Sequence, residues 1–351
     1  MIEIKNQMVY TMPLFSGDKQ WMVAGIDIGG TNTVVGIVDY DKNLIYENSF
    51  LTCPEEGVDK FVKRLTLQIK AAYTKFQTSH QLKGIGIAAP GANYLTGILE
   101  SPVNLKWGRV DIVLRVEKEF ATPVVLINDA HSAALGEQEF GSAKEMKNFI
   151  AITIGTGLGA GIILNGKLYR GENGHAGEIG HTIIEDNGRQ CSCGRKGCLE
   201  TYVSASGLKM TVFELLNQYN DKSKLRNLCF EEITAKQISQ LAMENDPIAL
   251  KAFDFIGRKL GTALVNLVTN FEPEAIILAG GLVESEELLL KPVREYFEMN
   301  LLYLYKGKVQ ILKSNLQNSN SGVLGACSSI LKKIGVSRTY ELSNSLRQVS
   351  Y

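Results

Sequence analysis

The sequence predicts an α/β protein built from two related lobes, and three observations carry this prediction. The chain has 351 residues, which is long for one hydrophobic core and favours two domains. Segments with the pattern of buried strands alternate with segments of helical periodicity. A hairpin of two strands joined by a glycine-rich loop occurs twice, at residues 25–38 and 151–164. Such an internal repeat predicts that the two lobes share a common design.

The first lobe opens with a meander of strands and continues with a helix and two further strands. Its expected elements are strands at residues 23–28, at 34–38 and from Leu44, a helix over 58–76, a strand at 84–88, a helix near 109–120 and a strand at 124–127. The residues before the first strand have no clear periodicity and are expected to be irregular.

The second lobe begins with the repeated hairpin. At a constant offset of 126 residues, Ile26 matches Ile152 and Ile37 matches Ile163; chance similarity of two glycine-rich hairpins is the alternative. Beyond it we expect a long helix that starts after Asp246–Pro247, a strand at 275–279 and a helix over 322–334. The predicted boundaries are a lead-in at 1–21, lobes at 22–130 and 131–338, and a tail at 339–351.

Composition excludes some classes of partner. Lysine and arginine number 37, as do aspartate and glutamate, and this balance argues against a nucleic acid as the main partner. The sequence contains neither an apolar run of about 20 residues that could span a membrane nor a signal-peptide pattern. We therefore expect a cytoplasmic protein without a membrane partner, in which clustered cysteines are metal ligands and not disulfides.

Three glycine-rich loops follow expected strands and are candidates for holding phosphate. Glycine allows the backbone N–H groups to approach an anion closely. None of the loops has the Walker pattern, but three at strand ends favour a bound nucleotide. Asp27 lies just before the first loop and is suited to hold hydrated Mg²⁺, whereas its counterpart in the repeat is Thr153. The nucleotide-binding residues expected in these loops are Gly29, Gly30, Thr31, Thr156, Gly157, Gly280 and Gly281.

The strand at residues 124–127 leads to Asn128 and Asp129. By itself, Asp129 is typical of the cap of a following helix. Transfer of a phosphoryl group also requires a carboxylate that accepts the proton of the acceptor hydroxyl. Asp129 is the best candidate for this base in the chain.

A cluster of cysteines and histidines predicts a structural metal site. Cys191, Cys193 and Cys198 lie within eight residues, shortly after His175 and His181. Three thiolates and one imidazole make a closed tetrahedral zinc site. Spacing alone leaves both histidines open as the fourth ligand, and a redox or buried cysteine cluster is the alternative to zinc.

Taken together, these motifs resemble the ROK family (repressors, open reading frames and kinases), in particular its glucokinase-like sugar kinases. The resemblance covers residues 22–335. The motifs are Asp-x-Gly-Gly-Thr at Asp27, Asn-Asp at Asn128, Gly-Thr-Gly-x-Gly at Gly155, Gly-His-x-Gly-Glu-x-Gly-His at Gly174 and Cys-x-Cys-Gly-x-x-Gly-Cys-x-Glu at Cys191. It implies a two-lobed, actin-like ATPase fold of the hexokinase type, with ribonuclease H-like lobes that close over ATP–Mg²⁺ and a sugar.

The resemblance also implies roles for individual residues. Asp129 would be the general base on the primary hydroxyl of the sugar. The sugar hydroxyls would be bound by Asn104, Asn128, Glu178, His181 and Glu200. The family pattern selects His181 over His175, so the zinc ligands would be His181, Cys191, Cys193 and Cys198.

The implied reaction is the ATP-dependent conversion of glucose to glucose 6-phosphate. The segment at residues 88–94 departs from the Gly-x-Pro-Gly pattern of many glucokinases, which leaves mannose, allose, fructose, N-acetylglucosamine and N-acetylmannosamine open. Repressors of the family carry a DNA-binding domain ahead of the kinase-like part. Because only about 21 residues precede the first expected strand, we expect an enzyme and not a sugar-responsive regulator. The resemblance further implies a homodimer or homotetramer.

Overall fold

The computed structural model describes residues 20–100, 102, 105–316 and 321–335. The described chain divides into two compact units, one of residues 20–128 with 326–335, and one of residues 129–325. The sequence placed the boundary at residue 130 and the whole last helix in the second lobe. In the structure this helix, α8 (Ser321–Lys333), crosses the division, because its residues from Ala326 onward pack with the first unit. The expected α/β fold is confirmed in each unit.

The first unit is built on a five-stranded sheet with the strand order β3-β2-β1-β4-β8. Strands β1, β2 and β3 are antiparallel neighbours, and β4 and β8 extend the sheet in parallel. The elements of this unit are β1 (Gln20–Ile28), β2 (Asn32–Asp39), β3 (Leu44–Leu51), η1 (Pro54–Glu56), α1 (Val58–Thr74), β4 (His80–Ala89), β5 (Ala92–Asn93), β6 (Ile98–Glu100), β7 (Arg109–Val110), α2 (Ile112–Glu117) and β8 (Val124–Asn128).

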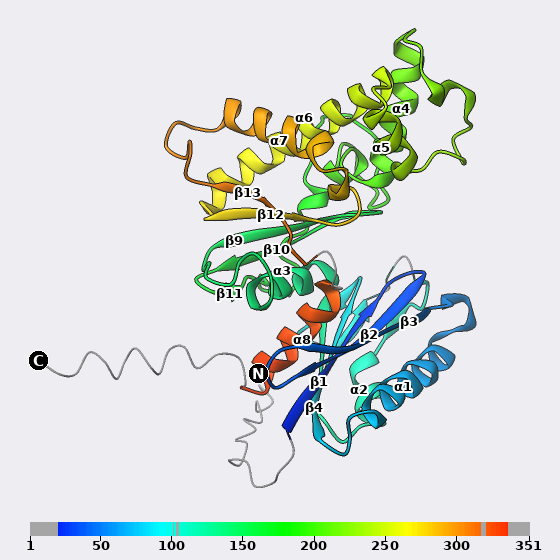
Figure 1. Ribbon diagram of the computed structural model, residues 1–351, viewed down its shortest axis with the longest axis vertical. Helices are drawn as coiled ribbons and strands as arrows, with labels where there is room; N and C mark the ends of the chain where they lie inside the picture. Colours follow the sequence, from blue (N-terminus) through cyan, green and yellow to red (C-terminus); the bar gives the residue numbers. More distant parts are fainter. Residues whose placement is uncertain (1–19, 101, 103–104, 317–320, 336–351) are drawn as a thin grey trace, which may run out of the picture. The chain divides into compact units, whose positions relative to one another are not determined.

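Two faces of this sheet are covered by different helices (Figure 1). Alternate residues of β1, such as Ile26, pack with α1 and α2 in one hydrophobic core. On the other face, a Cβ atom at Gly86 of β4 would lie 1.9 Å from the carbonyl oxygen of Ala326 in α8. Glycine is therefore needed there for the helix to approach the sheet. The helix expected near 109–120 is shorter than expected, because Arg109–Val110 pairs with β6 and Asp111 caps α2.

The second unit contains a sheet of the same design, with the order β11-β10-β9-β12-β13. Its elements are α3 (Asp129–Glu139), β9 (Phe149–Ile154), β10 (Leu158–Leu164), β11 (Lys167–Leu168), η2 (Ile179–His181), η3 (Leu199–Thr201), α4 (Ala205–Gln218), η4 (Lys224–Asn227), α5 (Ala235–Met243), α6 (Pro247–Phe271), β12 (Ala275–Ala279), η5 (Val283–Ser285), α7 (Glu287–Asn300) and β13 (Gln310–Lys313). No helix among the described residues is both long and apolar enough to cross a membrane.

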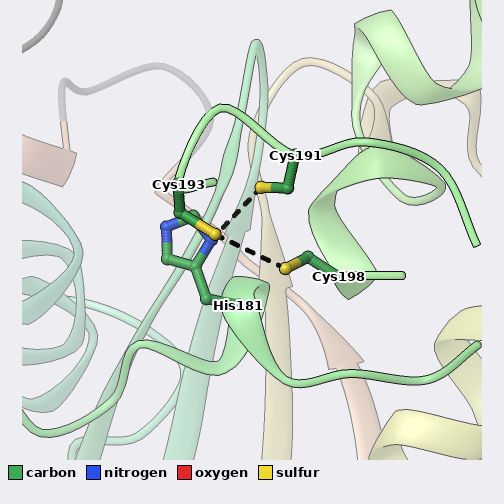
Figure 2. Close-up of side chains that lie close together, drawn as sticks. All are labelled: His181, Cys191, Cys193 and Cys198. Carbon is green, nitrogen blue, oxygen red and sulfur yellow. Dashed lines mark hydrogen bonds between the residues drawn. The ribbon is translucent and has the colours of Figure 1, made fainter. Parts of the chain in front are cut away.

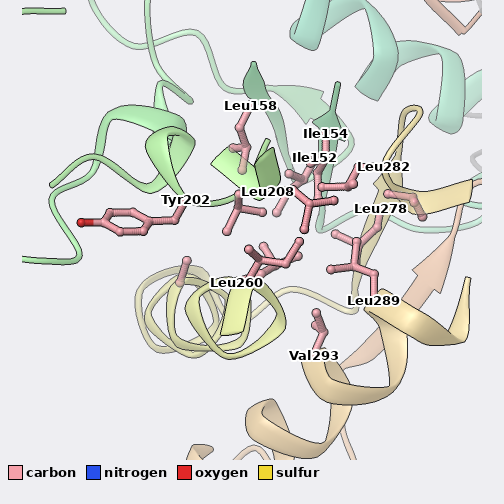
Figure 3. Packing of buried hydrophobic residues seen from close by; sticks show 14 of the residues in the cluster. Ile152, Ile154, Leu158, Tyr202, Leu208, Leu260, Leu278, Leu282, Leu289 and Val293 are labelled. Carbon is pink, nitrogen blue, oxygen red and sulfur yellow. The ribbon is translucent and has the colours of Figure 1, made fainter. Parts of the chain in front are cut away.

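Helices also cover both faces of this sheet (Figure 1). Ile152 and Leu278 face the core that the sheet shares with α6 and α7, where Leu260 and Val293 pack (Figure 3). On the other face α3 lies so close to β10 that a Cβ atom at Gly161 would be 2.4 Å from the Cβ atom of Ala134. Small residues thus hold the helix that begins at Asp129 directly against the sheet.

The predicted duplication of the hairpin is confirmed, but the overlay at a constant offset is wrong beyond the loop. In the first hairpin Ile28 pairs with Thr33, which leaves four residues between them. In the second, Ile154 pairs with Leu158, which leaves three. The second loop is one residue shorter, so β10 aligns with β2 at an offset of 125, and Gly36 matches Gly161 instead of Ile162.

Candidate functional site

The first glycine loop, Gly29–Thr31, connects β1 and β2 and is supported by Thr52. The Thr52 backbone N–H donates to the Thr31 carbonyl at 2.8 Å, and its hydroxyl donates to the Gly29 carbonyl at 2.8 Å. Asp27 is half-buried, next to last in β1, and pairs in register with Val34 of β2. The predicted magnesium ligand therefore lies on a paired strand, two residues before Gly29.

Asp129 is the first residue of α3, directly after β8. Its Oδ1 accepts a hydrogen bond of 2.9 Å from the Ala130 backbone N–H, in the first turn of the helix. The side chain is exposed to solvent. Desolvation by the surrounding protein nevertheless raises its pKa above the ordinary value of 3.8. A carboxylate that solvent can reach and that resists ionisation is suited to accept a proton.

The second glycine loop connects β9 and β10 and is bound by a residue from far along the chain. The Leu158 backbone N–H donates to Glu200 Oε2 at 2.8 Å. A Cβ atom at Gly157 would lie 2.5 Å from the same oxygen, so glycine is needed for this contact. Glu200, predicted to bind sugar, is thus joined to the loop predicted to bind phosphate.

The third loop follows β12 at Gly280–Gly281. It borders a cavity of about 370 Å³ whose other walls include Val283, Glu284 and Ser314. Gly280 has φ of +99° and lies against the Ile154 backbone, where a Cβ atom would be 2.5 Å from the carbonyl oxygen. The cavity is large enough to hold part of a nucleotide.

The four predicted metal ligands come together in the second unit (Figure 2). One donor atom each from His181, Cys191, Cys193 and Cys198 lie within 4.8 Å of one another. His181 Nδ1 is 3.7 Å from Cys191 Sγ, and Cys193 Sγ is 3.6 Å from Cys198 Sγ. His175, the alternative ligand, is not in this group.

These distances fit a tetrahedral zinc ion. Zn–S bonds of about 2.3 Å place neighbouring sulfur atoms of a tetrahedron roughly 3.7 Å apart. Hydrogen bonds from the backbone and side chain of Arg195 lower the pKa of Cys193 to about 6, whereas burial raises the pKa of Cys198 to about 12. A dication bound by the cluster would therefore have to displace the proton of Cys198.

Arg189, which the sequence analysis did not single out, anchors the metal-binding segment. Its guanidinium donates to the Thr201 carbonyl at 2.8 Å and to Thr211 Oγ1 at 2.9 Å. It also forms an ion pair with Glu214 of α4 and lies 4.5 Å from the centre of the Tyr202 ring. The side chain thus ties the segment to α4.

His131 joins α3 to the segment that carries Glu178 and His181. Its Nε2 donates to the Ala176 carbonyl at 2.6 Å. Burial lowers the pKa of His131, so the neutral imidazole with the proton on Nε2 makes this bond. No role was predicted for His131 from the sequence. The signal was its place two residues after Asp129, on the helix that Asp129 begins.

The structure thus brings together only some of the predicted site residues. Glu200 contacts the loop at Gly157, and His181 contacts the cysteine cluster, while Glu178 is exposed directly before η2. Asp27 and Asn128 belong to the first unit. Asn104 lies outside the described residues.

Comparisons with known proteins place the chain in a family. Residues 23–333 match the ROK family. A glucokinase of Halalkalibacterium halodurans is 34% identical over 316 residues, which are 87% of this chain and 93% of that protein. A xylose repressor of Caldicellulosiruptor bescii is 32% identical over 295 residues, 83% of this chain and 74% of the repressor.

A solved structure agrees with both the sequence and the fold. The ROK family glucokinase from Streptomyces griseus, in complex with glucose and AMPPNP, superposes with a TM-score of 0.74 at 32% identity. The match covers 88% of this chain and 98% of that one. The fold is thus that of a solved ROK structure, and the chain belongs to the ROK family.

Proposed function

We propose that this chain is an ATP-dependent sugar kinase that phosphorylates the primary hydroxyl of a hexose, with glucose as the leading substrate. The observation that carries the proposal is the hydrogen bond between Glu200 and the Leu158 N–H. It joins an acid of the metal-binding segment to a glycine loop of the kind that holds phosphate. Phosphoryl transfer to a sugar requires such joint positioning of acceptor and phosphate. The likeness to glucokinases supports the same activity.

In the proposed reaction the Asp129 carboxylate accepts the proton of the primary hydroxyl as the hydroxyl oxygen attacks the γ-phosphorus of ATP. The bond from the γ-phosphorus to the bridging oxygen breaks, and ADP leaves. The raised pKa of Asp129 makes the carboxylate a stronger base than an ordinary aspartate. Asp27 would hold hydrated Mg²⁺, and the N–H groups of the three glycine loops would bind the nucleotide phosphates.

Binding of the sugar is assigned to the acids and amides that the family pattern selects. Glu178, Glu200, Asn128 and Asn104 would hydrogen-bond the ring hydroxyls. His181 turns Nδ1 toward Cys191, so Nε2 is the nitrogen that remains for a sugar hydroxyl. One residue would then serve the metal and the sugar together.

Zinc would act as a structural ion here. Three thiolates and one imidazole complete a tetrahedron and leave no position for a substrate. Bound zinc would hold the segment from His181 to Glu200 in shape, and through Glu200 it would also hold the loop at Gly157. Cys193→Ser should therefore release zinc, raise the KM for the sugar about tenfold and lower the Tm. Metal content by mass spectrometry checks the first effect; a metal-free variant with unchanged kinetics would contradict a structural ion.

The proposed activity is tested by a coupled assay of ADP release. The substrate panel is glucose, mannose, allose, fructose, N-acetylglucosamine and N-acetylmannosamine, each with ATP and Mg²⁺. We expect the highest kcat/KM with glucose and a 6-phosphate as the product, identified by ³¹P NMR. Turnover with another sugar of the panel but not with glucose would support the assignment as a kinase and would contradict glucose as its substrate.

A sugar-responsive regulator is the second candidate, and the similarity to a xylose repressor is the observation that favours it. This candidate predicts sugar binding without phosphorylation. If no sugar causes ADP release and the protein binds DNA sequence-specifically in a mobility-shift assay, the regulator is the correct assignment and the kinase is not.

The expected homodimer or homotetramer is a separate prediction, which light scattering on the same sample tests.

A further inference from the structure

Ser314 lies directly after β13 and forms part of the wall of the cavity next to Gly280–Gly281. Its backbone N–H donates to the Leu278 carbonyl at 2.8 Å, which continues the sheet for one more residue. Its hydroxyl accepts a hydrogen bond of 3.1 Å from the Leu316 N–H. A turn of this kind, closed by a serine hydroxyl, sets the direction of the chain. Ser314 thus shapes part of the wall of the cavity that the glycine pair also lines.

The hydroxyl of Ser314 donates a hydrogen bond to Glu137 Oε1. This contact gives a reason for the presence of a glutamate at a buried position. Glu137 belongs to α3, two helical turns after Asp129, and only 1% of its surface is exposed. Its second oxygen accepts from the Ser142 N–H at 2.9 Å. Both donors are neutral groups. A buried carboxylate held by neutral donors is expensive to desolvate, and an alanine or leucine would fill a helix position of this kind at lower cost.

We propose that Glu137 and Ser314 are positioning residues for the nucleotide: α3 holds the Ser314–Leu316 turn through Glu137 and so sets part of the wall of the cavity that Gly280–Gly281 also lines. This inference rests on the proposed function, since it assumes that the nucleotide enters this cavity. The same helix then carries the proposed base at its first residue and the support of the nucleotide wall at its ninth.

The second unit contains a matched control for this contact. Ser223 donates to Asp246 Oδ1 at 2.9 Å and accepts from the Leu225 N–H at 3.1 Å. It therefore repeats the pattern of Ser314, a hydroxyl bound to a carboxylate and to the amide two residues on. Neither Ser223 nor Asp246 is among the described residues that line the cavity at Gly280. Removal of the Ser223 hydroxyl therefore measures how much such a hydrogen-bond pattern contributes to stability at a place where no nucleotide is proposed to bind.

The experiment compares Ser314→Ala, Glu137→Gln, Ser314→Thr and the control Ser223→Ala with the wild type. For each protein, KM for ATP, KM for the sugar and kcat are measured, with the Kd of ADP from titration calorimetry and the Tm. Ser314→Ala should raise the KM for ATP and the Kd of ADP about tenfold, with the sugar KM changed less than about twofold. Ser314→Thr keeps the hydroxyl and should restore nucleotide binding. Ser223→Ala should lower the Tm without changing nucleotide binding.

Several outcomes would overturn the inference. One is Ser314→Ala with the ADP affinity of the wild type; another is an equal rise in both KM values, which a merely structural role predicts. If Glu137→Gln does not fold, Ser314→Ala still decides the question. A wild type that phosphorylates no sugar contradicts the proposed function, while the ADP titrations continue to test Ser314. A wild type that does not bind ADP overturns both.

Discussion

The two five-stranded sheets share one design and differ in what is attached to it. In each, a glycine loop joins the central strand to an antiparallel neighbour, and two parallel strands extend the sheet on the other side. In the first sheet the loop is supported locally, by Thr52 directly after β3. In the second it is supported by Glu200, 42 residues beyond its partner Leu158. The second loop therefore depends on the metal-binding segment, and the first does not.

The polar residues at the strand ends also differ. Asp27 of the first hairpin is replaced by Thr153 in the second, and the last strand of each sheet is followed by Asp129 in one case and by Ser314 in the other. Asp27 and Thr153 occupy equivalent positions of the two hairpins, so the hairpin backbone itself does not require the carboxylate. The duplication supplies the scaffold, and the differences between its halves supply the proposed reaction.

The largest effect is expected from substitution of Asp129, the residue that follows the last strand of the first sheet. Asp129→Asn removes the proton acceptor, so kcat should fall about 10³-fold while sugar binding is retained. Desolvation by the surrounding protein disfavours the charge of Asp129 at neutral pH, so the variant should keep or raise the Tm, and this gain should vanish at low pH, where the wild type is protonated. Assays of turnover, sugar titration and thermal unfolding measure these effects. Unchanged turnover would remove Asp129 from the reaction.

The pH profile tests the same carboxylate without a mutation. Asp129 acts only when ionised, and its pKa is raised above 3.8 by desolvation. As pH falls through the raised value, kcat/KM should decline about tenfold per pH unit. The midpoint of the decline of kcat/KM at acid pH should therefore lie above the pKa of an ordinary aspartate. Thermal unfolding at each pH serves as the control, and a midpoint at or below pH 3.8 in folded protein would contradict the assignment.

The two hairpins offer a matched pair of substitutions. Asp27→Asn should lower kcat about 10²-fold and raise the Mg²⁺ concentration needed for half-maximal rate, because a carboxylate near the phosphate loop is lost. Thr153→Ala at the equivalent position removes only a weak contact of 3.4 Å to the Gly159 carbonyl, and should change kcat less than about threefold. Equal effects of the two would show that the hairpins do not differ in function.

The smallest effect is expected from a substitution that disturbs the contact between Glu200 and the second glycine loop. Gly157→Ala places a Cβ atom 2.5 Å from Glu200 Oε2, which should displace the carboxylate and raise the KM values for ATP and sugar about tenfold. At Gly155 no described atom lies within 4 Å of a Cβ atom. Gly155→Ala is therefore the steric control, expected within about twofold of the wild type. If Gly157→Ala behaves like Gly155→Ala, the loop does not depend on Glu200.

Much of the fold could be predicted because the decisive patterns are local. Buried strands such as Ala275–Ala279 are apolar runs between turn residues. Helix α6 begins at Pro247, directly after Asp246, which caps the helix by accepting from the Ile248 and Ala249 N–H groups. The off-by-one overlay of the hairpins was an error of a different kind. A loop that is one residue shorter leaves the apolar pattern nearly unchanged, and only the strand pairing reveals it.

The sequence by itself determined the α/β class and the duplication, because both follow from local patterns. It also determined the candidate chemistry, because a strand or a helix rarely needs the residue types found in the cysteine cluster, in the glycine loops and at Asp129. Only the tertiary structure decided which partner each polar group finds: Glu200 with Leu158, His131 with Ala176, and Glu137 with Ser314. These pairs lie 42 to 177 residues apart along the chain. The physical reason is that a hydrogen bond depends on distance and direction in space, whereas a sequence pattern records only the burial and backbone conformation that each residue favours.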